Sequence, residues 1–210
     1  MYNIPKINEL IDVLKDNYSE AIKSFDNIIG IHSYFNREIM LGDIDADVGE
    51  AVEAYIRFFN VMDEEENIPI EDRQPIKIYI DSGGGDLCAT LTMIDAIRMS
   101  KTPVWTINVG AAYSGGFFTF IAGHKRIAYP HSTFLYHEGS TQYGGDAGKF
   151  RNLADFYTKK QLPMLKDITL KYTNISESLY EEKKRDDWWL TSDEALELGI
   201  CDEICEDFVR

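Results

Sequence analysis

The sequence predicts an α/β fold built on a parallel sheet, because strand patterns and helix patterns alternate along its middle. β-rich runs at Ile76–Ile80 and Val104–Val109 are each followed by an apolar helical pattern, at Leu87–Met99 and Ser114–Ala122. The connections between these elements are short, and parallel strands need a crossover helix between them. We therefore expect a parallel sheet with helices packed around it.

The composition is that of a globular protein with a strongly acidic balance. The chain has 210 residues, of which 44% are hydrophobic, and 36 acidic against 21 basic side chains give a formal net charge of −15. This length suits one sizeable domain, or a domain with an appendage. The acidic balance argues against a nucleic acid or an anionic membrane as a partner held by bulk electrostatics.

The cysteines and the amino terminus favour a cytoplasmic location. Cys88, Cys201 and Cys205 have neither metal-binding nor disulfide-framework spacing, which is typical of free thiols in a reducing compartment. The first residues lack the basic and apolar regions of a secretory signal. The uncharged run Thr102–Gly123 is long enough to span a bilayer, but glycines interrupt it. We interpret this run as a buried strand, turn and helix, and we expect neither a metal site nor a cofactor.

The sequence before the central sheet predicts an N-terminal appendage followed by the first elements of the main domain. Amphipathic helical spacing in residues 1–35 predicts an N-terminal helical extension, followed by one domain over residues 36–210. A short strand is expected at Arg37–Ile44. The pattern at Asp47–Met62 predicts a helix with Asp47 as its cap, and Asp63–Pro75 reads as a charged surface loop.

The elements after the sheet predict a helical carboxyl-terminal half. Two short strands are expected near residues 126–129 and 133–137. A long polar helix follows from Asp146 to about Tyr172, which Pro163 should kink or divide. A shorter helix is expected at residues 176–184. Thr191 and Glu194 form a capping-box pattern that opens a last short helix, and a strand finishes the pattern near residues 200–204.

The run Gly110–Gly116 places Ser114 where a strand gives way to a helix. Backbone N–H groups are unpaired at the start of a helix, so this turn is a small anion site. Its glycines let substrate or backbone approach closely. Such a turn suits the nucleophile of an acyl-transfer reaction. Small residues at a strand-to-helix junction can also serve packing alone.

Four segments in order and spacing make the chain resemble the ClpP peptidase family, the proteolytic subunits of Clp machines. They are Asp81–Asp86, Gly110–Gly116, Leu135–His137 and Asp187–Ala195. The resemblance extends from about Arg37 to Ile204. It implies a ClpP/crotonase-type ββα spiral, in which residues 36–210 form the peptidase domain and the helix at about 146–172 is the handle helix.

The resemblance also implies a Ser-His-Asp triad. It places the nucleophile at Ser114, the general base at His137 and the acid at Asp187, with the adjacent Asp186 as the alternative acid. The backbone N–H groups of Gly85 and Gly115 would form the oxyanion hole. In such a triad the imidazole removes the serine proton, and the carboxylate orients the imidazole.

The sequence departs from the family pattern at the oxyanion turns. The family usually has proline where Gly83 stands and methionine where Gly115 stands, so both turns should be looser here. Asp86 adds a negative charge beside one proposed donor. The amino-terminal helices do not match the family's short axial-loop segment, which puts docking of the usual unfoldase in doubt.

The function that the resemblance implies is that of a serine endopeptidase subunit, itself independent of ATP, in a self-compartmentalising ring protease. Its implied partners are further copies of the chain in two stacked heptameric rings, polypeptide substrates and, as a candidate, an AAA+ unfoldase. The alternatives are a phage-type ClpP-like capsid-maturation protease, a catalytically silent ClpP-like scaffold, and a crotonase-type acyl-CoA enzyme. The last would use basic residues for the CoA phosphates, which this acidic chain supplies sparingly.

Overall fold

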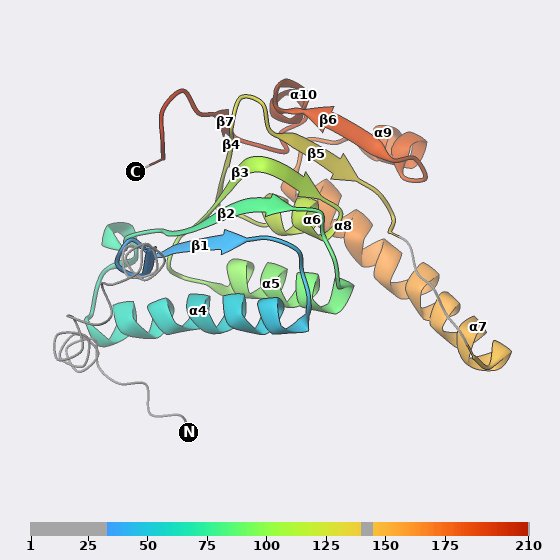
Figure 1. Cartoon of the computed structure of the whole chain (residues 1–210), viewed down its shortest axis with the longest axis horizontal. Helices are drawn as coiled ribbons and strands as arrows, with labels where there is room; N and C mark the ends of the chain where they lie inside the picture. Colours follow the sequence, from blue (N-terminus) through green and yellow to red (C-terminus); the bar gives the residue numbers. More distant parts are fainter. Residues whose placement is uncertain (1–32, 140–144, 210) are drawn as a thin grey trace, which may run out of the picture. The chain divides into compact units, whose positions relative to one another are not determined.

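A mostly parallel sheet of seven strands forms the centre of the protein (Figure 1). The computed structural model describes residues 33–139 and 145–209. The chain consists of two units, residues 1–38 and residues 39–210, and the fold below is that of the second. The expected N-terminal helices lie outside the described residues except for a few positions, so the helical extension stays a prediction.

The strand order shows how the sheet is built. Strands β1-β2-β3-β4-β7 lie side by side in that order, and β5 pairs with both β3 and β6. The pairs β2–β3, β3–β4, β3–β5 and β4–β7 are parallel, whereas β5–β6 is antiparallel. This arrangement confirms the predicted α/β class with a parallel sheet. The strands are β1 Glu38–Leu41, β2 Ile76–Ser82, β3 Val104–Tyr113, β4 Lys125–Ala128, β5 Thr133–Tyr136, β6 Trp188–Thr191 and β7 Glu203–Ile204.

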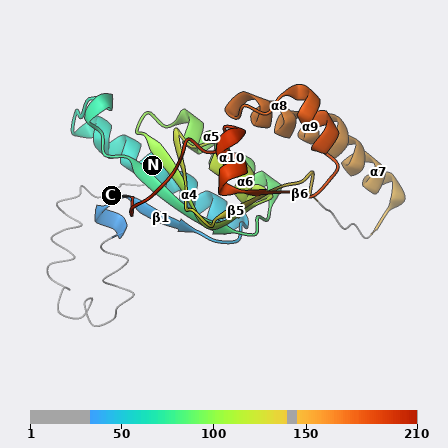
Figure 2. The ribbon, with the colours of Figure 1, turned by 90° about the horizontal axis from the view of Figure 1, so that it is seen from above.

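Helices cover the sheet and extend beyond it (Figures 1 and 2). They are α4 Ala46–Glu65, α5 Leu87–Met99, α6 Gly115–Ile121, α7 Ala147–Phe156, α8 Leu162–Tyr172, α9 Glu177–Lys183 and α10 Ser192–Glu197, with a short 3-10 turn at Ile70–Asp72. Every residue of α6 is buried, because this helix packs between the sheet and α8. No helix within residues 33–139 and 145–209 combines the length and apolar character that crossing a membrane requires.

Helix α4 differs from its prediction at both ends. Asp45, not Asp47, caps it, and the Asp45 carboxylate accepts a hydrogen bond of 2.8 Å from Val48 N. The helix continues to Glu65, so Asp63 belongs to the helix and is fully buried rather than part of a solvated loop. Its carboxylate accepts a 2.7 Å hydrogen bond from the Thr102 hydroxyl. A buried carboxyl group needs such a hydrogen-bond partner, and this one lies 39 residues away in the sequence.

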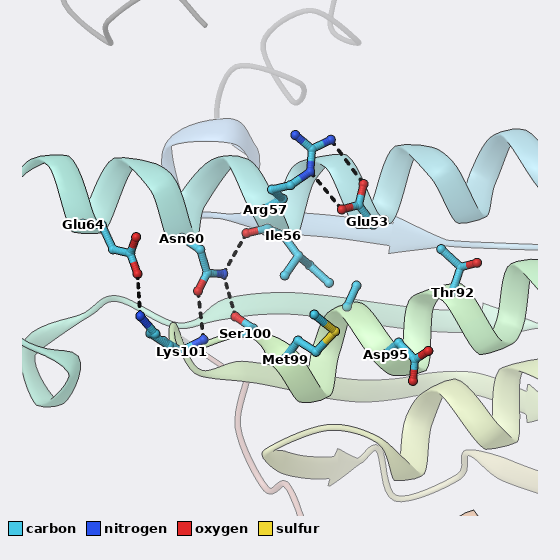
Figure 3. A pocket seen from close by; sticks show the side chains of 11 residues that line it. Glu53, Ile56, Arg57, Asn60, Glu64, Thr92, Asp95, Met99, Ser100 and Lys101 are labelled. Carbon is cyan, nitrogen blue, oxygen red and sulfur yellow. Dashed lines mark hydrogen bonds and ion pairs between the residues drawn. The ribbon is translucent and has the colours of Figure 1, made fainter. Parts of the chain in front are cut away.

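Asn60 joins α4 to the turn that follows α5 (Figure 3). Its amide nitrogen donates to Ser100 Oγ, and its amide oxygen accepts from the backbone N–H groups of Lys101 and Thr102. A cavity of about 420 Å³ lies between the two helices beside this joint. The Asn60 side chain therefore forms hydrogen bonds with three polar groups at the point where α5 ends and the chain turns towards β3.

The handle is one continuous run of helix with a wide turn in its middle. Helix α7 passes into the π-helical segment η2, Tyr157–Gln161, and then into α8. In η2 the N–H of Leu162 donates to Tyr157 O, five residues back. Pro163 follows directly and has no N–H to complete the normal bond to Lys159 O. The expected disturbance by proline is therefore a widened turn, and the helix does not end there.

The neutral imidazole of His124 is hydrogen-bonded to the first residue of β3. Val104 N donates a 3.0 Å hydrogen bond to His124 Nδ1, which only an unprotonated nitrogen can accept. Burial lowers the pKa of His124 below its usual 6.5, and the nearby Arg98 lowers it further. The folded chain thus resists protonation at this position.

We expect the free energy of unfolding to fall as the pH drops below 6.5, because His124 in the unfolded chain then binds a proton that the folded chain excludes. His124→Asn keeps an acceptor for Val104 N and does not titrate, so its stability should fall less. The measurement is urea unfolding at about pH 7.5 and about pH 5.5. The exposed His131→Gln is the control, and an Asn variant with the same pH dependence as the parent would contradict this account.

Candidate active site

The carboxyl ends of β2, β3 and β5 point the same way, towards the handle (Figure 1). The turn Gly83–Gly85 follows β2, Ser114 follows β3, and His137 follows β5. The parallel pairing of β3 with β2 and with β5 brings these three chain ends to one edge of the sheet. This edge of a parallel sheet is where such folds commonly place their binding sites.

Ser114 has a left-handed backbone conformation, with φ 53° and ψ −117°. A residue other than glycine held in such a conformation stores strain of about 1–3 kcal/mol, and residues of this kind cluster at functional sites. Hydrogen bonds hold it on both sides. Ser114 N donates to Leu135 O at 2.9 Å, and Ser114 O accepts from Phe118 N at 3.2 Å. The serine therefore sits on a sharp, fixed turn at the start of α6.

The glycine turn after β2 packs directly on this serine. Gly84 has φ +96°, and a Cβ added there would lie 2.7 Å from the Cβ of Ser114. Gly85 has φ +149°, and a Cβ added there would lie 1.9 Å from Ile44 O. Both positions thus need glycine, because both the backbone conformation and the available space exclude a side chain.

The backbone N–H groups of Gly85 and Gly115 lie near each other. Ile44 N donates to Gly84 O and Asp86 N donates to Ile44 O, both at 2.8 Å, in a parallel bridge. Because backbone groups alternate along an extended strand, the N–H of Gly85 faces away from Ile44. Gly85 N lies 3.4 Å from the place that a Cβ on Gly115 would occupy. Gly115 opens α6, so its N–H has no partner within the helix.

Gly115 lies in a crowded position. A Cβ at this position would lie 2.5 Å from the hydroxyl oxygen of Thr90, which itself donates to Asp86 O at 2.8 Å. Thr90 therefore occupies the space that a side chain at position 115 would need. The carboxylate of Asp86 is engaged as the cap of α5, where it accepts from Ala89 N at 2.8 Å.

His137 and Asp187 approach each other across the antiparallel pair β5–β6. The register places Tyr136 opposite Trp188, so the next residues outward, His137 and Asp187, also face each other. Their closest atoms, His137 Nδ1 and Asp187 Oδ1, are 3.8 Å apart. That distance exceeds a direct hydrogen bond of about 2.7–3.2 Å. The Asp187 side chain is 68% exposed, against 25% for His137.

One cavity of about 930 Å³ joins most of these groups. Ser114, His137, Gly85 and Gly115 all line it, whereas Asp187 stands outside the lining, beside the imidazole. An apolar wall faces them. It is formed by Phe118 and by residues of the handle, namely Phe150, Leu153, Phe156, Tyr157 and Leu165.

Thr90, Phe150, Phe156, Tyr157 and Leu165 line this cavity but are not among the residues that the sequence predicts for the site. The sequence predicts a long polar helix for the handle. The spacing of Phe150, Leu153 and Phe156 marks an apolar strip that could have been recognised. Thr90 has no comparable sequence signal, because its role depends on the close approach of α5 to Gly115.

A serine on a strained turn, an imidazole in the same cavity, a carboxylate beside that imidazole and two neighbouring backbone N–H groups suit acyl-transfer chemistry. Comparison with known proteins defines the class further. The family model described as Clp protease matches residues 32–208. The chain belongs to the Clp protease family, which confirms the family resemblance and the ClpP-type fold and makes it a member of a peptidase family.

Curated relatives carry the same description. The chain is 37% identical over 139 residues to the ATP-dependent Clp protease proteolytic subunit 2 of Thermobifida fusca, covering 64% of this chain and 67% of that protein. It is 31% identical over 173 residues to the subunit 2 of Nocardia farcinica, covering 80% of each. For the subunit 2 of Treponema pallidum the identity is 30% over 173 residues, covering 81% of this chain and 82% of that protein.

The position of the acid can be tested by a matched pair of variants. If Asp187 is the acid, Asp187→Asn should lower peptidase turnover by up to about 10⁴-fold, because the imidazole would then lack a carboxylate to orient it. Asp186→Asn is the control and should lose little. Both are measured with a fluorogenic peptide. Equal losses in the two variants, or a larger loss at Asp186, would contradict the assignment of Asp187.

Proposed function

We propose that the chain is the proteolytic subunit of a Clp-type protease and cleaves peptide bonds with Ser114, His137 and Asp187. The observation that carries the proposal is the left-handed Ser114, which opens into one cavity with His137 and the two glycine turns. Membership of the Clp protease family supports it. The oxyanion-hole donors in this proposal are the N–H groups of Gly85 and Gly115.

Each group has a defined task in this mechanism. His137 accepts the Ser114 proton as the hydroxyl oxygen attacks the peptide carbonyl, and it then returns the proton to the leaving amine. Asp187 orients the imidazole and stabilises its protonated form. Gly85 and Gly115 donate hydrogen bonds to the oxyanion, each contributing about 3–4 kcal/mol. Water then releases the acyl group by the same steps in reverse order.

The same proposal includes self-assembly through the handle. Large apolar side chains are exposed along it: Phe150, Leu153, Phe156 and Met164 are 44–54% exposed. A second subunit would cover such a strip. The 3.8 Å between His137 and Asp187 leaves room for closer contact when the handle is covered. We propose a double ring of heptamers, polypeptide substrates, a Clp ATPase as a partner and a cytoplasmic location.

The nucleophile is tested by covalent labelling. A fluorophosphonate probe should label the parent protein, and mass spectrometry should place the adduct on Ser114. Ser114→Ala should lose both labelling and peptide cleavage while keeping its fold and assembly, because the small hydroxyl contributes little to packing. Ser132→Ala, a buried serine outside the cavity, is the control. An alanine variant at position 114 that cleaves as fast as the parent would refute the mechanism.

The coupling of assembly to activity is tested on the handle. Leu153→Glu should reduce both assembly and turnover by about tenfold or more, because a charge cannot be buried unpaired at the interface. Asn152→Glu adds the same charge to the neighbouring exposed position, and we expect it to leave both unchanged. Analytical ultracentrifugation is run beside a peptidase assay. A fully active monomer, or an inactive Leu153→Glu variant that still forms a double ring, would contradict the coupling.

A further inference from the structure

Both neighbours of His137 are held by phenolic groups from the helical half of the chain. The tyrosine cluster that does this consists of Tyr136, Tyr157 and Tyr180. Tyr136 directly precedes His137, and Tyr157 contacts the residue that directly follows it. The backbone on either side of the proposed general base is therefore anchored within one subunit.

The anchor before His137 is a buried side chain. Tyr136 is 2% exposed, and its ring makes edge contacts with Phe117 and Phe118 at 5.8 Å between centroids. Its hydroxyl donates a 2.7 Å hydrogen bond to the hydroxyl of Tyr180 on α9. Ring packing and this hydrogen bond together fix the last residue of β5.

The anchor after His137 comes from the handle. The hydroxyl of Tyr157 donates a hydrogen bond to the backbone carbonyl of Glu138. It also lies 3.1 Å from the position of a Cβ on Gly139, where φ +87° turns the chain away from the strand. Tyr157 is the first residue of the π-helical segment η2, and such wide turns are frequent at functional sites.

The electrostatic surroundings keep this hydroxyl a donor. Burial raises the pKa of Tyr157, and the nearby Glu138 carboxylate and Tyr180 raise it further. The phenol therefore stays protonated across the neutral pH range. A protonated phenol can donate to Glu138 O whenever the site is active.

We propose that Tyr157 is a positioning residue whose hydroxyl holds the backbone after His137 so that the imidazole faces Ser114 and Asp187. This inference rests on the proposed peptidase function. The carbonyl carbon of Glu138 is four covalent bonds along the backbone from the Cα of His137. Loss of the hydrogen bond from Tyr157 therefore lets the Cα and the imidazole of His137 shift. Displacements of about 1 Å in a catalytic constellation cost up to about 10²-fold in rate.

Tyr157→Phe tests this role, because it keeps the ring that lines the cavity and removes only the hydroxyl. We expect kcat to fall roughly tenfold and KM to stay within about twofold, with a parallel fall in the rate of fluorophosphonate labelling at Ser114. Hydrogen exchange at residues 137–139 should become faster. Tyr79→Phe is the matched control, because the Tyr79 hydroxyl also donates to a backbone carbonyl, that of Val209, away from the cavity.

The outcomes separate this inference from the proposed function. Absence of Ser114 labelling in the parent protein would overturn the proposed function itself. Normal labelling in the parent together with an unchanged kcat in Tyr157→Phe would overturn only the positioning role. A raised KM with unchanged kcat would make Tyr157 a cavity wall. A variant that fails to fold or assemble would make the hydroxyl structural, and both results would contradict the inference.

Discussion

The left-handed conformation of Ser114 is the constraint on which the rest of the site depends. Strain of this kind persists only where the surroundings determine it fully. Here Leu135 O accepts the serine N–H, α6 begins directly behind it, and Gly84 leaves just enough space for its Cβ. A side chain at position 84 would displace the turn and with it the serine. In the proposed mechanism, the glycine run after β2 therefore supports the nucleophile and also supplies an oxyanion donor.

The handle contributes to the site from the other side of the cavity. Its apolar residues form a wall opposite Ser114, and Tyr157 reaches the backbone beside His137. The wide turn η2 lies just before Pro163, where an α-helical hydrogen bond cannot form. The wide turn before this proline contains Tyr157, through which the handle contacts the segment after β5. The carboxylate of Asp187 is the least enclosed member of the constellation, and this agrees with a site completed by assembly.

Much of the fold followed from local patterns in the sequence. The alternation of strand and helix predicted the parallel sheet. Residues Thr191 and Glu194 form the predicted capping box at the start of α10. Patterns of this kind report short-range geometry, so they identify elements well and their ends less well. The cap of α4 lies at Asp45 rather than at Asp47, because the choice between nearby aspartates depends on where the first helical turn closes.

The features that could not be predicted depend on contacts between distant residues. The sequence around Asp63 has the pattern of a charged loop. In the structure, however, Asp63 accepts a hydrogen bond from Thr102, which is 39 residues away. The candidate triad came from the order of short motifs in a family resemblance. The structure brings Ser114 and His137 to one cavity and places Asp187 beside the imidazole. Strand β6 was not predicted, although its pairing with β5 is what places Asp187 there.

The most direct test of the account is a crystal structure of the protein after reaction with a peptide boronate. We expect boron bonded to Ser114 Oγ, with one boron-bound oxygen within about 2.7–3.1 Å of both Gly85 N and Gly115 N. We also expect His137 within hydrogen-bond distance of the adduct. Boron on another residue, or an adduct on Ser114 whose oxygens approach neither glycine N–H, would contradict it.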